Sequence, residues 1–194
     1  MTRRLVGTVA IVVLCAACGK SPEEKQAEAI AKGAEQMAKG MAGAATQKPV
    51  NPVAFEALMP LLPELAGWVR ESPQGERITS IASVSTATTT YRKGDATIDA
   101  KITDTGMNQM FFAPFVVLMT SGYSHETTDG WEKATKFGEN PGLEKWEKST
   151  KTGTLDVIVG RRFLIEYEGR NVDDIRPVRE LVERTDLKTL AALK

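Results

Sequence analysis

The chain is short of the residue types that most catalytic and metal sites require. Its 194 residues include two cysteines, both within the first 18 positions, and one histidine, His125. These few ligands cannot supply the spaced Cys and His sets of a zinc site. The glycine-rich phosphate loop, the dinucleotide fingerprint and the calcium-binding loop are missing as well. The sequence therefore predicts no metal, no cofactor and no enzyme activity.

An excess of charge of one sign is also missing, because 25 Lys and Arg residues balance 25 Asp and Glu residues. Domains that bind nucleic acid present a strongly basic surface to the phosphate backbone. A balanced chain has no such electrostatic footprint, and it gives no charge-based reason to bind anionic surfaces. We therefore expect no nucleic-acid partner.

The apolar run near the start is too short to cross a membrane. Two arginines at positions 3 and 4 are followed by an apolar run from Leu5 to Leu14 and then by small alanines. A membrane-spanning helix needs about 20 apolar residues, so this run does not span a bilayer. The order of charged, apolar and small-residue regions is typical of a secretory signal peptide, which we assign to residues 1–17.

The end of this region, Leu14-Cys15-Ala16-Ala17-Cys18, resembles the lipobox of bacterial lipoproteins. The resemblance implies a diacylglycerol on the thiol of Cys18, cleavage just before Cys18, and acylation of the new amino group, so that palmitate would be incorporated. Cys15 stands where the family usually has Leu, Val or Ile. An ordinary signal peptide cleaved after Ala17 and an uncleaved signal anchor are the alternatives.

The lipobox resemblance also implies a location in the bacterial cell envelope, facing the periplasm. Two or three acyl chains make membrane attachment stable, whereas a single chain binds only marginally. Gly19 follows Cys18, and in enteric-type bacteria a residue other than Asp there usually implies transport to the outer membrane. Lys20 and Ser21 would favour retention at the inner membrane in some other lineages. We expect the outer membrane.

Residues 18–50 read as a lipidated N-terminus and an Ala-rich tether that contains no aromatic residue. Ser21 and Glu24 form a capping box around Pro22, which predicts a helix start. Alanine, isoleucine and methionine then recur at spacings of three and four residues, whereas glycines weaken the helix. We predict a frayed amphipathic spacer. A helix that pairs with a copy of itself or rests on the bilayer is the alternative.

Residues 51–194 carry the patterns of strands with one buried face and one wet face. From Ala96 to Thr103, alanine and isoleucine alternate with polar residues, as in antiparallel hairpins. Residues 77–92 are rich in Ile, Val, Thr and Ser, which favours a strand, and residues 155–167 predict a hairpin. WEKATKFG at position 131 returns as WEKSTKTG at position 146, which we interpret as two neighbouring strands of a meander.

Helical patterns flank these strands. Residues 52–65 carry a leucine-rich pattern interrupted by two prolines, and residues 175–182 carry an apolar stripe. Asp186 is placed to cap a last short helix. Consecutive strands with short turns, together with these helices, predict an α+β domain whose mostly antiparallel sheet is packed with helices. By the order of its elements alone, the outline resembles the Mog1/PsbP-like fold.

The segment from Gly106 to Gly122 is the most unusual part of this domain, because residues 110–119 are all apolar. A helix that is apolar all round is buried on most sides, so a central core helix is the first interpretation. Methionine adapts to irregular surfaces, so a helix that lines an apolar pocket or an interface is the second. The residues of this candidate pocket or interface are Met107, Met110, Phe111, Phe112, Phe115 and Met119.

The remaining polar residues form no recognisable catalytic set. His125 lies near Ser124 and Asp129 in the sequence, but neighbours in sequence do not make a triad. Aspartates such as Asp104 and Asp156 are expected to be solvated residues of turns or exposed strand faces. The Arg161–Arg162 pair is expected in a solvated turn, with a grip on an anion as the alternative.

These observations favour a non-enzymatic envelope lipoprotein that presents its domain for binding a protein partner or for assembling a complex. The alternative is a carrier or sensor of an apolar ligand held near residues 107–119. A hydrolase that uses carboxylates or His125 ranks third. In all three hypotheses the membrane is contacted through the lipid anchor on Cys18.

Overall fold

The computed structural model describes residues 50–79, 83–106 and 112–194. The predicted signal peptide, Cys18 and the tether up to residue 49 lie outside these residues. Among the described residues, no helix combines the length and the apolarity that crossing a bilayer requires.

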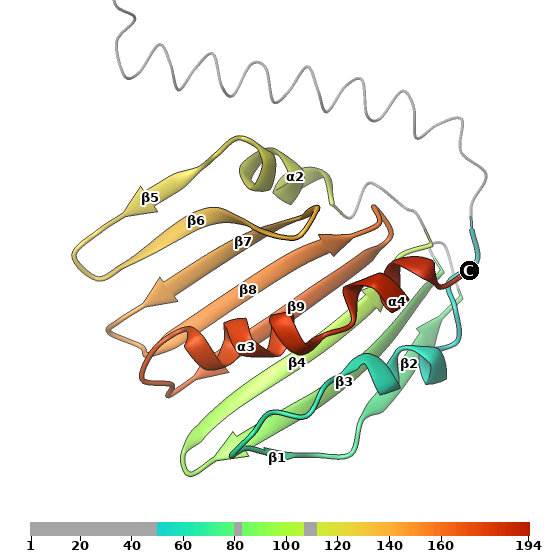
Figure 1. Ribbon diagram of the computed structural model, residues 1–194, viewed down its shortest axis with the longest axis horizontal. Helices are drawn as coiled ribbons and strands as arrows, with labels where there is room; N and C mark the ends of the chain where they lie inside the picture. Colours follow the sequence, from blue (N-terminus) through green and yellow to red (C-terminus); the bar gives the residue numbers. More distant parts are fainter. Residues whose placement is uncertain (1–49, 80–82, 107–111) are drawn as a thin grey trace, which may run out of the picture.

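Nine strands within the described residues form one sheet in which every pairing is antiparallel (Figure 1). The order across the sheet is β1-β3-β4-β9-β8-β7-β6-β5, and β2 pairs with β3 on the side where β1 also pairs. The strands are β1 (Val69–Arg70), β2 (Gln74–Ile78), β3 (Val84–Lys93), β4 (Ala96–Asp104), β5 (Ser124–Glu126), β6 (Gly130–Phe137), β7 (Asn140–Glu147), β8 (Thr152–Val159) and β9 (Phe163–Arg170).

Helices lie on both faces of this sheet, but one face is covered by four of them and the other by α2 alone among the described residues. Figure 1 shows α3 and α4 crossing one face, which the two 3-10 helices η1 and η2 also cover nearer to β3. The helices are η1 (Phe55–Ala57), η2 (Met59–Leu61), α2 (Ala113–Thr120), α3 (Arg176–Arg184) and α4 (Leu187–Ala192). The predicted α+β architecture, with a mostly antiparallel sheet packed with helices, is confirmed.

Strict alternation along the strands separates the two faces. In β4, Ile98, Ala100 and Ile102 are buried beneath the helices, and Asp99 and Lys101 between them point to the opposite side. We call the side of Ile98 the covered face and the side of Asp99 the groove face. The covered face holds the main core, which includes Leu58, Leu62, Tyr91, Leu155, Val157, Phe163, Ile165, Tyr167, Val178, Leu181, Val182 and Leu190.

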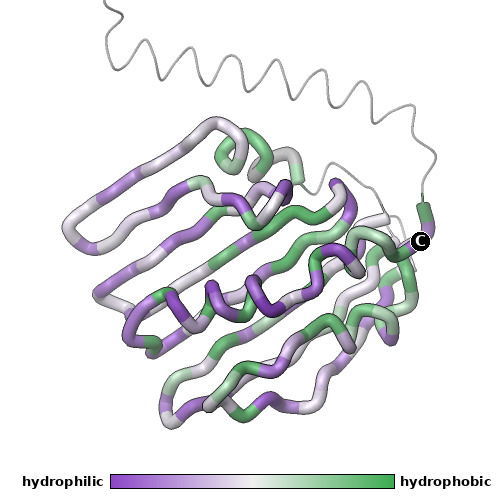
Figure 2. The backbone as a smooth tube through the Cα atoms, viewed as in Figure 1, coloured by the Kyte–Doolittle hydropathy of each residue, from purple (hydrophilic) through white to green (hydrophobic). Residues whose placement is uncertain are grey.

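The helix α2 belongs to the groove face. It packs on β6 and β7, and its cluster contains Leu143, Ile158 and Leu164, which alternate with core residues such as Val157 and Ile165. Neighbours along a strand point to opposite faces, so α2 covers the β6–β8 part of the groove face. Figure 2 shows α2 hydrophobic along its length and α3 mostly hydrophilic.

Two sequence expectations need correction. Residues 52–65 form the short 3-10 helices η1 and η2, because the prolines at 60 and 63 prevent a continuous α-helix. Residues 77–92 are not one strand: β2 ends at Ile78, β3 begins at Val84, and the two pair as antiparallel neighbours. The Ser- and Thr-rich sequence between them lacks the glycine or proline that usually marks a turn.

Several other predicted elements of the domain are confirmed. The alternating segment 96–103 is β4, the hairpin over 155–167 is β8 and β9, and the apolar stripe at 175–182 lies in α3. Asp186 caps α4 by accepting a hydrogen bond from the backbone N–H of Thr189 at 2.9 Å. The echoed segments are not two neighbouring strands as predicted: WEKATKFG runs along β6, whereas WEKSTKTG holds only the last two residues of β7, a turn and the start of β8.

Candidate functional site

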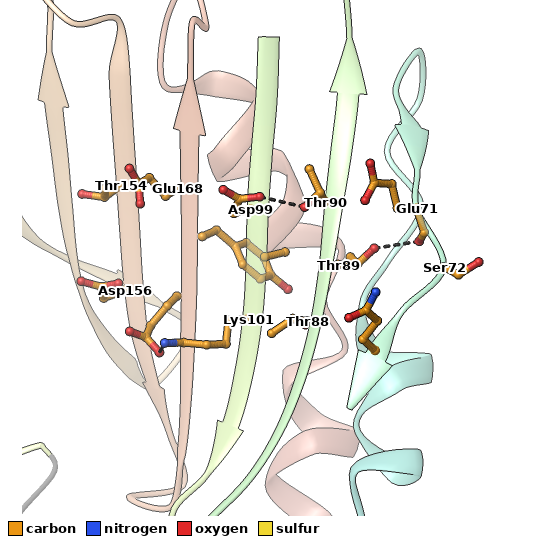
Figure 3. Close-up of a pocket in the computed structure, with 14 residues that line it drawn as sticks. Glu71, Ser72, Thr88, Thr89, Thr90, Asp99, Lys101, Thr154, Asp156 and Glu168 are labelled. Carbon is orange, nitrogen blue, oxygen red and sulfur yellow. Dashed lines mark hydrogen bonds and ion pairs between the residues drawn. The ribbon is translucent and has the colours of Figure 1, made fainter. Parts of the chain in front are cut away.

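The groove face carries a polar depression over the central strands of the sheet. It has a volume of about 500 Å³ and lies over β3, β4, β9 and β8, with the link between β1 and β2 at one side (Figure 3). Its lining residues are Glu71, Ser72, Gln74, Thr88, Thr89, Thr90, Asp99, Ala100, Lys101, Thr154, Asp156, Glu166, Tyr167 and Glu168. We call this depression the groove.

Strand register explains why these side chains meet. Pairing of β3 with β4, of β4 with β9 and of β9 with β8 places residues opposite one another in rows across the sheet. One row is Thr90, Asp99, Glu168 and Thr154, and the next row is Thr88, Lys101, Glu166 and Asp156. Residues as far apart in the sequence as Thr88 and Glu168 therefore share one surface.

Ion pairs and hydrogen bonds order much of this surface. Lys101 Nζ lies 2.7 Å from Glu166 Oε2. Arg170 pairs with Asp99 at 2.7 Å and with Glu168 at 3.0 Å. Thr90 donates its hydroxyl to Asp99 at 2.8 Å, a bond drawn in Figure 3. These exposed pairs contribute little stability each, so their main effect is to orient the polar side chains of the groove.

Asp156 is the carboxyl group of the groove with the most perturbed ionisation. Its pKa is raised to about 7, chiefly by burial and next by the neighbouring carboxylate of Glu166, while Lys101 opposes the rise. Lys101 is engaged by Glu166, and no ion pair to Asp156 occurs among the described residues. The groove therefore contains a half-buried carboxyl group that gains or loses its charge near neutral pH.

The groove as a whole has an acidic lining. Its carboxyl residues are Glu71, Asp99, Asp156, Glu166 and Glu168, whereas Lys101 is its only basic lining residue. The guanidinium groups of Arg92 and Arg170 neutralise part of this charge from the side, through Glu71, Asp99 and Glu168. Hydroxyl and amide groups of Ser72, Gln74, Thr88 and Thr154 complete a surface suited to hydrogen bonding rather than to apolar packing.

The predicted apolar site is only partly within the described residues. Phe112 and Met119 are both 2% exposed and pack with Leu143 and Ile158 in a second core cluster. Phe115 belongs to α2 by its backbone, and nothing is described for its side chain. Met107, Met110 and Phe111 lie outside the described residues. The structure thus brings Phe112 and Met119 together in a packed cluster, away from the residues that line the groove.

The expectation that Asp104 and Arg162 are solvated is wrong. Asp104 is fully buried, Arg162 is 7% exposed, and they form a two-point ion pair with nitrogen–oxygen distances of 2.9 and 2.7 Å. Asp104 also accepts hydrogen bonds from the backbone N–H groups of Val53 and Gly106, and Arg162 donates to the carbonyl of Leu193. This buried pair joins four chain segments, at Val53, Asp104–Gly106, Arg162 and Leu193. The Arg162 guanidinium is thus already occupied by a carboxylate.

The remaining candidate residues occupy separate places. His125 is exposed in the short edge strand β5, opposite Glu132 of β6, and Arg161 is exposed in the turn between β8 and β9. Within the described ranges, no group of three or more His, Cys, Asp or Glu residues is placed to hold a metal ion.

Sequence reasoning missed the groove, although one of its signals was visible. The polar positions of β4, from Thr97 to Thr103, predict one wet face, and that face is the floor of the groove. The sequence did not indicate that β4 pairs with β9, because the two strands are joined through α2 and four other strands. The companions of Asp99 and Lys101 therefore could not be identified.

Comparisons with known proteins give no family assignment. No family model matches the chain, and no curated protein matches it significantly. Among solved structures, the crystal structure of the extracellular domain of PknH from Mycobacterium tuberculosis is similar, with 9% sequence identity and a TM-score of 0.43. The match covers 72% of this chain and 98% of that chain. A similarity of this size assigns neither a family nor a function.

Proposed function

We propose that this chain is a lipid-anchored protein of the bacterial cell envelope that has no enzymatic role and binds a protein partner on its groove face. The observation that carries the proposal is the contrast between the two faces of the sheet. Helices bury the covered face, whereas the groove over β3, β4, β9 and β8 remains open and polar. Ordered polar side chains around a depression are suited to recognising a partner's polar groups.

The proposed lipid anchor determines where the domain would be held relative to the membrane. The lipobox-like sequence places the acyl chains on Cys18, and residues 19–49 join Cys18 to the first described residue. Fully extended, a segment of this length reaches up to about 100 Å. The domain can therefore present its groove well away from the bilayer, in the periplasm, with the outer membrane as the expected attachment site.

The apolar-ligand alternative receives no specific support from the described residues. A carrier site needs an enclosed apolar cavity, whereas the described side chains of this segment, Phe112 and Met119, are packed against Leu143 and Ile158. The groove itself is lined mainly by carboxyl, hydroxyl and amide groups. A hydrogen-bonding partner fits this chemistry better than a lipid.

The anchor is tested by metabolic labelling with palmitate. The wild-type protein is expected to incorporate label, and Cys18→Ser is expected to lose the label and to accumulate as the unprocessed precursor. A Cys18→Ser protein that still incorporates palmitate would refute the assignment of the anchor. Separation of the membranes on a density gradient then tests the expected outer-membrane location.

The groove is tested by photo-crosslinking in intact cells. A photoreactive amino acid replaces Thr88 in the groove or, as the matched control, Glu183 on the exposed side of α3. We expect a discrete protein adduct from position 88 and none from position 183. Equal adducts at both positions, or none at either, would contradict partner binding on the groove face.

A further inference from the structure

The strand β2 leaves one side of the sheet open. It pairs with β3 on one side, and no described strand pairs with its other side. All five of its residues, Gln74 to Ile78, are exposed. Such an edge presents a row of unpaired backbone N–H and C=O groups, which natural proteins usually shorten, twist or cover. The opposite edge of the sheet follows this rule, because β5 has only three residues.

We propose that β2 is a docking edge, at which an extended segment of a partner protein adds as a further strand and places a Lys or Arg side chain on the groove face. This inference rests on the proposed function, since it names how the partner of the groove is held. Strand addition supplies affinity through main-chain hydrogen bonds, and alternate side chains of the added segment supply specificity.

Register connects this edge to the groove. Gln74 lies opposite Thr88, Glu76 opposite Thr86 and Ile78 opposite Val84. Gln74 and Thr88 both line the groove, so Glu76 and Ile78, which are two and four residues further along β2, also point to the groove face. Every second side chain of an added strand would therefore extend the polar surface of the groove.

The other face of β2 is contacted by η1 at Gly75, whereas Arg77, also on that side, is exposed. Gly75 pairs with Ala87, a residue of the main core. A Cβ atom built on Gly75 would lie 2.0 Å from the ring of Phe55, so this ring occupies the space where a side chain would be. The 3-10 helix η1 thus approaches β2 at Gly75 from the covered face, so the acidic residues that an added strand would meet lie on the groove side.

Charge and exposure determine the chemistry of the incoming segment. The groove lining contains five carboxyl residues and one lysine, and the exposed Glu76 adds a further carboxylate beside it. Ile78 is 49% exposed, which is unusual for a large apolar residue of this domain. Facing residues in neighbouring strands interact directly. The fitting segment therefore carries a basic residue opposite Glu76 and an apolar residue two positions away, opposite Ile78.

A second copy of this chain fits the same edge less well. A two-fold axis perpendicular to the sheet would join two β2 strands and set two acidic grooves side by side on one face. Like charges at this spacing repel one another, whereas a basic segment is attracted. Dimerisation through β2 is the rival outcome that the experiment must detect.

The test uses the full mature chain in detergent micelles and a synthetic peptide as the probe. The probe has nine residues and alternates threonine with lysine and valine, so that its basic and apolar side chains share one face when it is extended. Three matched peptides are compared: the probe, a version with glutamate in place of lysine, and a version N-methylated at alternate residues to remove main-chain donors. Binding is measured by fluorescence anisotropy, and amide hydrogen exchange locates the site.

We expect the lysine probe to bind with a dissociation constant below about 1 mM and to slow amide exchange within Gln74–Ile78 but not within β5. The glutamate version should bind about fivefold more weakly, and the N-methylated version should not bind. Glu76→Lys, an exposed substitution that leaves the core intact, should reverse the preference between lysine and glutamate peptides.

Three results would overturn the docking edge: no binding of the probe at 1 mM, equal binding of the N-methylated peptide, or a dimer protected at the same five residues. Any of these results, combined with a retained adduct at position 88 in cells, would remove the docking edge and leave the proposed function standing. Loss of the adduct at position 88 would instead remove the proposed function.

Discussion

The covered face and the groove face are built from the same strands but do different work. Along β4, the covered-face residues Ile98 and Ile102 are fully buried, whereas Asp99 and Lys101, which alternate with them, carry partly exposed ion pairs. Burial of apolar area stabilises the fold, and exposed pairs contribute little to stability. One face of the sheet therefore supplies most of the buried apolar area, and the groove on the other face stays open, as the proposed partner binding requires.

The carboxylates of the two faces also differ in burial and in pairing. The covered face also contains carboxylates, but each is fully buried and held by an arginine: Asp104 by Arg162, and Glu144 by Arg179 of α3. On the groove face the carboxylates are partly exposed, with side-chain exposures of 34% for Glu166 and 40% for Glu168. The carboxylates Asp104 and Glu144 on the covered face are thus buried in ion pairs within the domain. Those of the groove face remain accessible to a partner.

The largest effect is expected from Asp104→Ala. This change leaves the Arg162 charge buried without a partner and leaves two backbone N–H groups unsatisfied. The free energy of unfolding should fall by about 4 kcal/mol, measured by chemical denaturation of the mature chain. The matched control is Asp99→Ala, which breaks an exposed pair on the other face of β4 and should cost less than about 1 kcal/mol. Equal losses would break the distinction between the faces.

A somewhat smaller effect is expected from Ile102→Ala on the covered face. Ile102 is fully buried in the main core, so truncation should lower the free energy of unfolding by about 3 kcal/mol through lost burial and a cavity. The neighbour Lys101 makes an exposed ion pair, and Lys101→Ala should cost less than about 1 kcal/mol. A large loss from Lys101→Ala in the same denaturation experiment would show that the groove face also stabilises the fold.

The smallest of the three expected effects is the pH dependence that Asp156 gives to the free energy of unfolding. Its pKa is about 7 in the folded chain, against 3.8 as the ordinary value. The folded state therefore keeps a proton that the unfolded state releases, so stability falls as pH rises from about 4 to 7 and is level above that.

Asp156→Asn removes this ionisation and should flatten the corresponding pH dependence. At pH 8 the variant should be more stable than the wild type by about 2 kcal/mol, a value below the full pKa shift because solvent reaches the groove. At pH 4 the two proteins should have nearly equal stability. Denaturation curves at both pH values provide the measurement, and a variant that is destabilised at pH 8 would contradict the burial of Asp156.

The spacing of apolar residues was sufficient to predict strands and helices in which buried positions recur with a fixed period. The alternation in β4 predicted its two faces, and the stripe at 175–182 predicted the buried side of α3. The same alternation extends to Asp104, which follows Ile98, Ala100 and Ile102 on the covered face. Its burial could have been inferred had the period been preferred to the usual behaviour of aspartate.

Long-range pairing is what the sequence could not supply. The groove needs β4 beside β9, and no local pattern specifies which strands pair across a long connection. The partner of Arg162 is 58 positions away in the sequence, and the sequence between β2 and β3 contains no glycine or proline. The site was therefore missed for the same reason that the fold was found only at the level of its class.

Carboxylate footprinting in the envelope tests the central claim most directly. A carbodiimide with a small amine labels exposed carboxylates, and labelling is compared between intact cells and the purified mature chain. We expect Glu166 and Glu168 on the groove face to be protected in cells but not in the purified protein, whereas Glu183 on α3 is labelled equally in both. Equal labelling of Glu166, Glu168 and Glu183 in both samples would contradict a partner on the groove face.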